Sequence, residues 1–140
     1  MIVLWTGNLS VGIERFDDDH KRLIRLLNEL HSATRYLDVN GDMESDEIEI
    51  ALHRLDNYTR YHCSQEETAM AQTGFPGIEA HKREHEKLIQ AIADMMLRFH
   101  GSTSPLHAEE MMRAIYDWIV DHINVVDKEY SEHLIAKGIH

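Results

Sequence analysis

Apolar residues recur every three or four positions over most of the chain, and this spacing marks out four segments. Side chains at that spacing lie on one face of an α-helix. The segments span about 18–37, 45–72, 78–100 and 106–137, whereas residues 1–16 lack the pattern and are expected to form an N-terminal arm. The apolar-face positions are Leu23, Leu27, Leu30, Ile48, Leu52, Leu55, Tyr58, Ile78, Leu88, Ile92, Met95, Phe99, Met111, Ile115, Trp118, Val125 and Val126. No segment alternates with the two-residue period of a strand, so the pattern predicts an all-α protein.

Turn-forming residues separate the four segments. Glycine, proline or asparagine occurs in each break, at 40–42, 74–77 and 101–105. In the last break Ser104 is a plausible N-cap, with Pro105 at the first helical position. Short connections between long amphipathic helices favour antiparallel neighbours. We therefore predict one domain over residues 1–140, built as an antiparallel up-down-up-down four-helix bundle with an N-terminal arm.

Histidines continue the apolar faces of all four segments. Five of the eleven histidines fall there, together with one glutamate: His20, His62, Glu66, His81, His85 and His122. A single histidine on such a face is more often a hydrogen-bonded core residue. A buried, unpaired carboxylate is costly, however, and a cation would neutralise it. The other six histidines, at 31, 53, 100, 107, 133 and 140, follow no such pattern and are expected to be solvated.

The spacing of these residues suits metal binding. His62 and Glu66 are four residues apart, as are His81 and His85, so each pair can reach one ion from a helix. Five imidazoles and a carboxylate exceed the needs of one tetrahedral zinc and suit two first-row transition ions. Mixed nitrogen and oxygen ligands favour iron, although they leave manganese, cobalt and zinc open.

Charge and composition exclude several classes of partner. The chain has 14 basic and 25 acidic residues, a formal net charge of −11. Nucleic acids and anionic membrane surfaces would repel such a chain. Cys63 is the single cysteine, so the chain can form neither an internal disulfide nor a thiolate zinc cage. No apolar run is long enough for a signal peptide or a membrane span, so we expect a cytoplasmic protein. The strong negative charge favours a monomer.

The motifs resemble those of the bacterial hemerythrins, a family of non-haem di-iron bundles that bind oxygen. The chain carries H-x-x-x-E at His62, H-x-x-x-H at His81 and H-x-x-x-x-D at His122, in that order. Flanking blocks also match, namely 16–23, 58–70, 74–76 and 118–123. The similarity covers almost the whole chain.

The resemblance implies seven ligands for two iron ions. His81, His85 and His122 would hold one ion, whereas His20 and His62 would hold the other and leave a position open. Two carboxylates, Glu66 and Asp127, would bridge the ions together with an oxo or hydroxo group.

The position of Asp127 does not follow from helical periodicity. It lies five residues after His122, about 140° around an ideal helix. Either a carboxylate that reaches across or a local π-bulge would reconcile the two. This assignment therefore depends mainly on the resemblance.

The resemblance further implies reversible dioxygen binding, in a carrier, storage or delivery protein rather than an enzyme. Nitric oxide or small anions are possible ligands of the open iron. Cys63, Trp118, Ile119 and Ile123 would line the oxygen pocket. The family usually has phenylalanine where this chain has Cys63, so the cysteine either enlarges the pocket and speeds autoxidation or is a small buried apolar residue.

Three alternatives compete with this interpretation, and the sequence argues against the first of them. An oxidase or iron-storage bundle of the ferritin type would need Glu-x-x-His elements, and no glutamate of this chain has a histidine three residues later. A sensor of oxygen, redox state or nitric oxide would act through a partner protein. A structural bundle would bind zinc, which elemental analysis distinguishes from iron.

Overall fold

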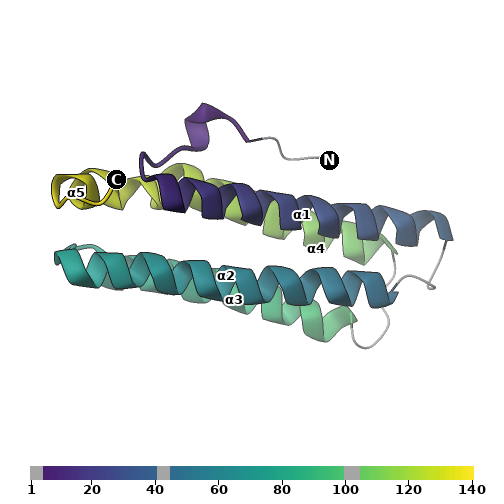
Figure 1. The fold of residues 1–140 in the computed structure, drawn as a ribbon. Helices are drawn as coiled ribbons and strands as arrows, with labels where there is room; N and C mark the ends of the chain where they lie inside the picture. The colour runs from purple at the N-terminus through teal and green to yellow at the C-terminus, as the bar shows by residue number, and fades with distance from the viewer. Residues whose placement is uncertain (1–4, 41–44, 100–104) are drawn as a thin grey trace.

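Four long helices run alternately up and down along the molecule (Figure 1). The computed structural model describes residues 5–40, 45–99 and 105–140. The helices are α1 (Glu14–Asn40), α2 (Ser45–Thr73), α3 (Ile78–Phe99) and α4 (Pro105–Asp121). Within those ranges there is no strand, and the predicted all-α four-helix bundle is confirmed.

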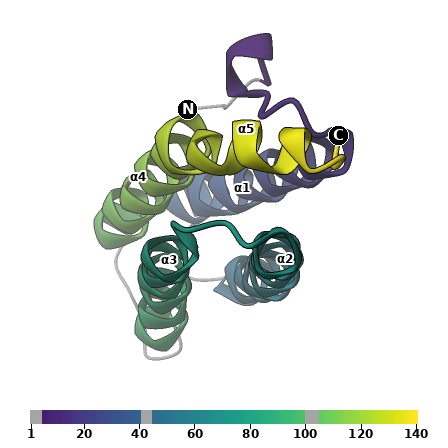
Figure 2. The same cartoon turned by 90° about the vertical axis from the view of Figure 1, so that its left-hand side faces the viewer.

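The helices form a square in which neighbours in sequence are neighbours in space. Helix α1 packs against α2 and α4, and α3 packs against the same two helices. The view along the bundle shows this arrangement, with the connection from α2 to α3 at the near end (Figure 2). The short helix α5 (Lys128–Ala136) lies at this end too, beside the start of α1.

The first helix begins earlier than the expected residue 18, and the arm before it is correspondingly shorter. The carbonyl of Ile13 accepts hydrogen bonds from the amides of Phe16 and Asp17, at 3.1 and 2.9 Å. The Asp17 carboxylate also accepts a 2.8 Å hydrogen bond from the amide of Val11. Acidic residues in the first turn favour a helix N-terminus, which explains why the helix extends back to Glu14. The arm retains one 3₁₀ turn, η1 (Gly7–Leu9).

The fourth predicted segment is three elements rather than one helix. Helix α4 ends at Asp121, a π-helix labelled η3 covers His122–Val126, and α5 follows from Lys128. The apolar spacing of the segment continues through this change, so periodicity alone does not reveal it.

Helix α2 ends in a glycine motif. Gly74 adopts a φ of 68°, a left-handed conformation that favours glycine. The amides of Gly74 and Phe75 donate to the carbonyls of Ala71 and Met70, at 3.3 and 3.0 Å. These bonds close the helix end and turn the chain towards α3, as the predicted break requires.

Two apolar clusters occupy the two ends of the bundle, and a polar layer separates them. The larger is built mainly on Leu23, Leu27, Leu30, Ile48, Leu52, Leu55, Leu88, Ile92, Met95, Ile115, Ile119 and Ile123. The smaller lies near α5 and comprises Val11, Ile13, Phe16, Ala69, Met70, Tyr130 and Leu134. Tyr58, Ile78, Trp118 and Val126 are half-buried. The predicted positions Phe99, Ser104, Met111 and Val125 have side chains outside the described part.

None of the described helices is long and apolar enough to cross a membrane.

Candidate metal centre

All seven predicted ligands lie in the polar layer between the apolar clusters. Each is at most 5% exposed, in contrast to the usual surface position of histidine and carboxylate side chains. Their donor atoms form two groups, and in each group all the donor atoms lie within 4.8 Å of one another. One group contains three imidazoles, and the other contains two. Glu66 and Asp127 belong to both groups.

The helices place these residues at one level of the bundle. His20 comes from α1, and His62 and Glu66 lie one turn apart on α2. His81 and His85 lie one turn apart on α3. The long helices bring these residues together because the same faces also carry the core leucines and isoleucines.

The π-helix resolves the position of Asp127. Its amide donates a 2.9 Å hydrogen bond to the carbonyl of His122, five residues earlier. In an i→i+5 turn, residues five apart return to the same face. Of the two explanations considered for this spacing, the structure shows the π-helical one. Both side chains are buried, His122 at the first residue of η3 and Asp127 at the residue that follows it.

Each carboxylate faces both groups, with one oxygen towards each. For Glu66, Oε1 lies 3.0 Å from His85 Nε2 and Oε2 lies 3.1 Å from His62 Nε2. For Asp127, Oδ1 lies 3.0 Å from His81 Nε2 and 2.8 Å from His122 Nε2. Its other oxygen, Oδ2, lies 3.0 Å from His20 Nε2. This division of the oxygens is the arrangement that carboxylates bridging two ions require.

The donor atoms fit metal ions better than they fit one another. Despite these short distances, both oxygens of Asp127 lack a hydrogen-bond partner. The same is true of the Nε2 atoms of four histidines: His20, His62, His81 and His122. Buried polar atoms seldom lack partners. Two donors about 2.1 Å from one ion and at right angles to each other lie about 3.0 Å apart, close to the spacing found here.

The carboxylates dominate the electrostatics of the layer. Burial opposes a charge on His62, but the Glu66 carboxylate and the hydrogen bond to Asp19 raise its pKa to about 10. Burial likewise opposes a charge on His81, and bonds to Asp127 and Glu66 raise its pKa to about 9. Burial favours the neutral form of Glu66, yet the charge of His62 holds its pKa well below the ordinary value. The layer thus attracts positive charge, either protons or a metal.

Two carboxylates that sequence reasoning did not assign orient the imidazoles from outside. Asp19 Oδ2 accepts a 2.8 Å hydrogen bond from His62 Nδ1, and Glu67 Oε2 accepts a 2.7 Å bond from His85 Nδ1. Such partners fix the ring and direct the other nitrogen towards a metal. Glu67 is half-buried, unlike an ordinary surface glutamate. The sequence offered one indication of their role, because Asp19 and Glu67 are each adjacent in sequence to a predicted ligand.

Two tyrosines complete the hydrogen bonds around the layer. The Tyr58 hydroxyl donates to Asp19 Oδ1 at 2.7 Å, and the buried Tyr130 hydroxyl donates to Glu66 Oε2. Burial and the neighbouring carboxylate charges raise the pKa of Tyr130 well above its ordinary value, so it remains a donor. Tyr58 and Asp19 lie far apart in sequence, and no local pattern links them.

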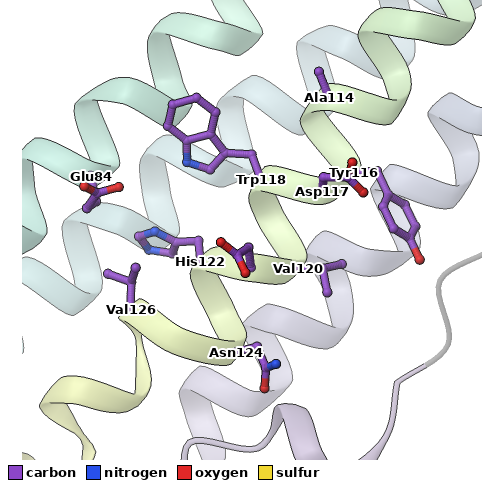
Figure 3. A pocket seen from close by; sticks show the side chains of 10 residues that line it. Glu84, Ala114, Tyr116, Asp117, Trp118, Val120, His122, Asn124 and Val126 are labelled. Atoms are coloured by element: carbon purple, nitrogen blue, oxygen red, sulfur yellow. The ribbon is translucent and has the colours of Figure 1, made fainter.

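The four residues predicted to line an oxygen pocket lie in different surroundings. Ile119 and Ile123 are buried in the larger apolar cluster. Cys63 is buried next to His62 on α2, where burial and then the Glu66 charge raise the pKa of its thiol. Trp118 is half-buried and lines a solvent-facing groove together with His122 (Figure 3).

The remaining histidines are not uniformly solvated. His53 and His140 are exposed, His31 is half-buried, and His100 and the side chain of His107 lie outside the described residues. His133 differs from the expectation, because it is half-buried and its Nε2 donates a 2.8 Å hydrogen bond to the carbonyl of Thr73. It joins α5 to the end of α2.

Fold and site together define a four-helix bundle with a buried centre of imidazoles and carboxylates able to hold two metal ions. Comparison with known proteins makes this class specific. Residues 11–134 match the Hemerythrin HHE cation binding domain family. The chain therefore belongs to the hemerythrin family.

Individual relatives resemble the chain over nearly its whole length. It is 32% identical over 136 residues to a bacteriohemerythrin of Methylococcus capsulatus, covering 96% of this chain and 98% of that protein. It is 30% identical over 135 residues to a bacteriohemerythrin of Stenotrophomonas maltophilia, covering 96% and 83%. A crystal structure of wild-type hemerythrin superposes with a TM-score of 0.81 at 31% identity, covering 96% and 98%.

Proposed function

We propose that this protein binds dioxygen reversibly at a non-haem di-iron centre. The chain's membership of the hemerythrin family supports an oxygen-binding di-iron protein, because the family is known for oxygen binding rather than catalysis. His81, His85 and His122 would hold one ion, and His20 and His62 would hold the other. Glu66 and Asp127 would bridge the two ions.

The observation that carries the proposal is the division of the carboxylate oxygens between the two groups of imidazoles. Oε1 of Glu66 and Oδ1 of Asp127 face the three-imidazole group, and Oε2 and Oδ2 face the two-imidazole group. One zinc ion held for structure alone needs four donors and no such division.

The unequal number of imidazoles provides a place for an external ligand. The group of His20 and His62 has one nitrogen donor fewer than the other group, so it leaves room for an external ligand. Bound iron would supply the redox chemistry for reversible dioxygen binding.

The residues around this position exclude water and hold the carboxylates still. The Phe16 ring packs edge-on against His62, with ring centroids 5.9 Å apart, and is fully buried. Tyr130 holds Glu66 Oε2 by its hydrogen bond, so the bridging carboxylate keeps its orientation. A dry, rigid pocket favours release of intact dioxygen over side reactions.

The test combines metal analysis with oxygen cycling. Protein purified without added metal should contain two iron ions per chain. After anaerobic reduction, air should produce a visible absorption band that disappears when oxygen is removed. Zinc in place of iron, or rapid irreversible oxidation in air, would contradict the proposal.

A further inference from the structure

A groove on the outer side of α4 ends at one of the proposed ligands. Its volume is about 610 Å³, and its walls come from Glu84 on α3 and from residues of α4 and η3. Figure 3 shows the His122 ring directed towards Glu84 and Val126, with Trp118 beside it. Two other grooves, of 450 and 510 Å³, include none of the seven proposed ligands.

The groove is lined by groups that attract cations. Three carboxylates line it, those of Glu84, Asp117 and Asp121. Asn124 also lines it, but its amide oxygen accepts a 3.3 Å hydrogen bond from Lys128 Nζ. Carboxylate oxygens are common ligands of divalent cations and attract them by charge. Lys87 lies 3.3 Å from Glu84 Oε1, but both side chains are solvent-accessible, so this pair is weak and an incoming ion can displace it.

His122 connects the groove to the buried layer. Its Nε2 lies 2.8 Å from Asp127 Oδ1 inside the bundle, whereas its Nδ1 has no hydrogen-bond partner. The Nδ1 atoms of His62 and His85 are fixed by carboxylates, whereas those of His20 and His81 lack a partner but do not line the groove. The His122 ring is therefore 95% buried, lines the groove, and has no hydrogen bond at Nδ1 to fix its orientation.

The centre itself is enclosed, because all seven proposed ligands are buried. An ion from solvent must therefore cross the protein surface at some point. We propose that this groove is the uptake route for hydrated ferrous ions: Glu84, Asp117 and Asp121 collect the cation, and His122 is the first ligand of the centre that it meets. The inference rests on the proposed function, since it requires that the centre hold divalent metal.

The test measures how fast the metal-free full chain takes up Co²⁺, followed by the visible absorption of the bound ion. The test variant carries Glu84→Gln, Asp117→Asn and Asp121→Asn. The control variant carries Glu14→Gln, Glu47→Gln and Glu132→Gln, which remove the same charge from exposed sites elsewhere. Uptake by the groove variant should be about tenfold slower at low ionic strength, while the control should match the unaltered protein. Salt should reduce the difference.

Release of the ion provides a second measurement on the loaded protein. The groove carboxylates do not hold the ion in its final position, so the affinity should be unchanged and release to excess chelator should slow by the same factor as uptake. Equal rates in all three proteins, or equal slowing in the control, would refute the route while leaving the metal centre intact. Failure of the unaltered protein to bind Co²⁺ would instead refute the proposed centre, and the route with it.

Discussion

The two halves of the buried layer are built from the same kinds of donor but differ in number and support. His81, His85 and His122 form one half, and His20 and His62 form the other. Each half faces one oxygen of Glu66 and one of Asp127. Each half also has one imidazole fixed from outside, His85 by Glu67 and His62 by Asp19. The larger half is thus close to a complete ligand set, whereas the smaller half has no donor to spare. Under the proposed function, the first half would only hold its ion, whereas the second would also bind the external ligand.

Removing the metal should have the largest effect, because it acts on both halves at once. The Nε2 atoms of four buried histidines and both oxygens of Asp127 would then lack a hydrogen-bond partner. Metal at a thousandfold excess over its Kd should stabilise the fold by about 4 kcal/mol, which raises Tm by about 10 °C. Thermal unfolding with and without chelator checks this expectation. Identical melting temperatures would mean that the layer is not a metal centre.

Single alanine substitutions should separate the halves. His62→Ala leaves the smaller half with one imidazole, so the protein should retain about one iron per chain. His122→Ala leaves the larger half with two imidazoles, so it should retain more iron than His62→Ala does. Elemental analysis of the two variants, purified side by side, gives the comparison. Equal losses would remove the distinction between the halves.

The supporting carboxylates should matter less than the ligands they orient. Asp19→Asn and Glu67→Gln should each lower metal affinity, within about 10- to 100-fold. The loss should be greater for Asp19→Asn, since His62 belongs to the half without a spare donor. Competition with a chelator of known affinity measures both. The conservative Tyr58→Phe change removes only the hydrogen bond to Asp19. The metal affinity of this variant should lie between those of Asp19→Asn and the unaltered protein.

Acid should release the metal, and the smaller half should lose its ion first. Without metal, neighbouring carboxylates raise the pKa values of His62 and His81 to about 10 and 9. Protons therefore already compete with the ion at neutral pH, and affinity should fall as pH decreases and rise as pH increases towards these values. Metal titrations between about pH 8 and pH 6 follow this competition. An affinity independent of pH would show that binding displaces no protons.

Cys63→Phe should have the smallest effect on the centre. Cys63 is buried beside His62, and a larger apolar side chain there should fill space near the two-imidazole half. We expect slower autoxidation of the oxygenated protein, together with a packing cost of about 1–3 kcal/mol. Decay of the visible band in air measures the first effect. Cys63→Val serves as the control, because it removes the thiol without adding an aromatic ring.

The periodicity of the sequence was sufficient to predict the four helices and six of the seven proposed ligands, namely five histidines and Glu66, on their inner faces. Helical spacing places His81 and His85 on the same side of their helix, and likewise His62 and Glu66, whatever surrounds them. The apolar residues on that side of each helix turn it towards the core. Glu66 followed from the same pattern, whereas Asp127 required a comparison with a known family.

Other features became visible only in the tertiary structure. The π-helix at His122–Val126 places Asp127 on the same face as His122, and the apolar spacing of the sequence does not reveal it. The two oxygens of Glu66 and of Asp127 face different groups of imidazoles. This depends on the side-chain conformations of the carboxylates and on how the helices pack. The links from Asp19 to His62 and from Glu67 to His85 join different helices for the same reason. Residue types and their period thus determined which donors face the core, and packing between helices decided which donors meet and which group has the fewer imidazoles.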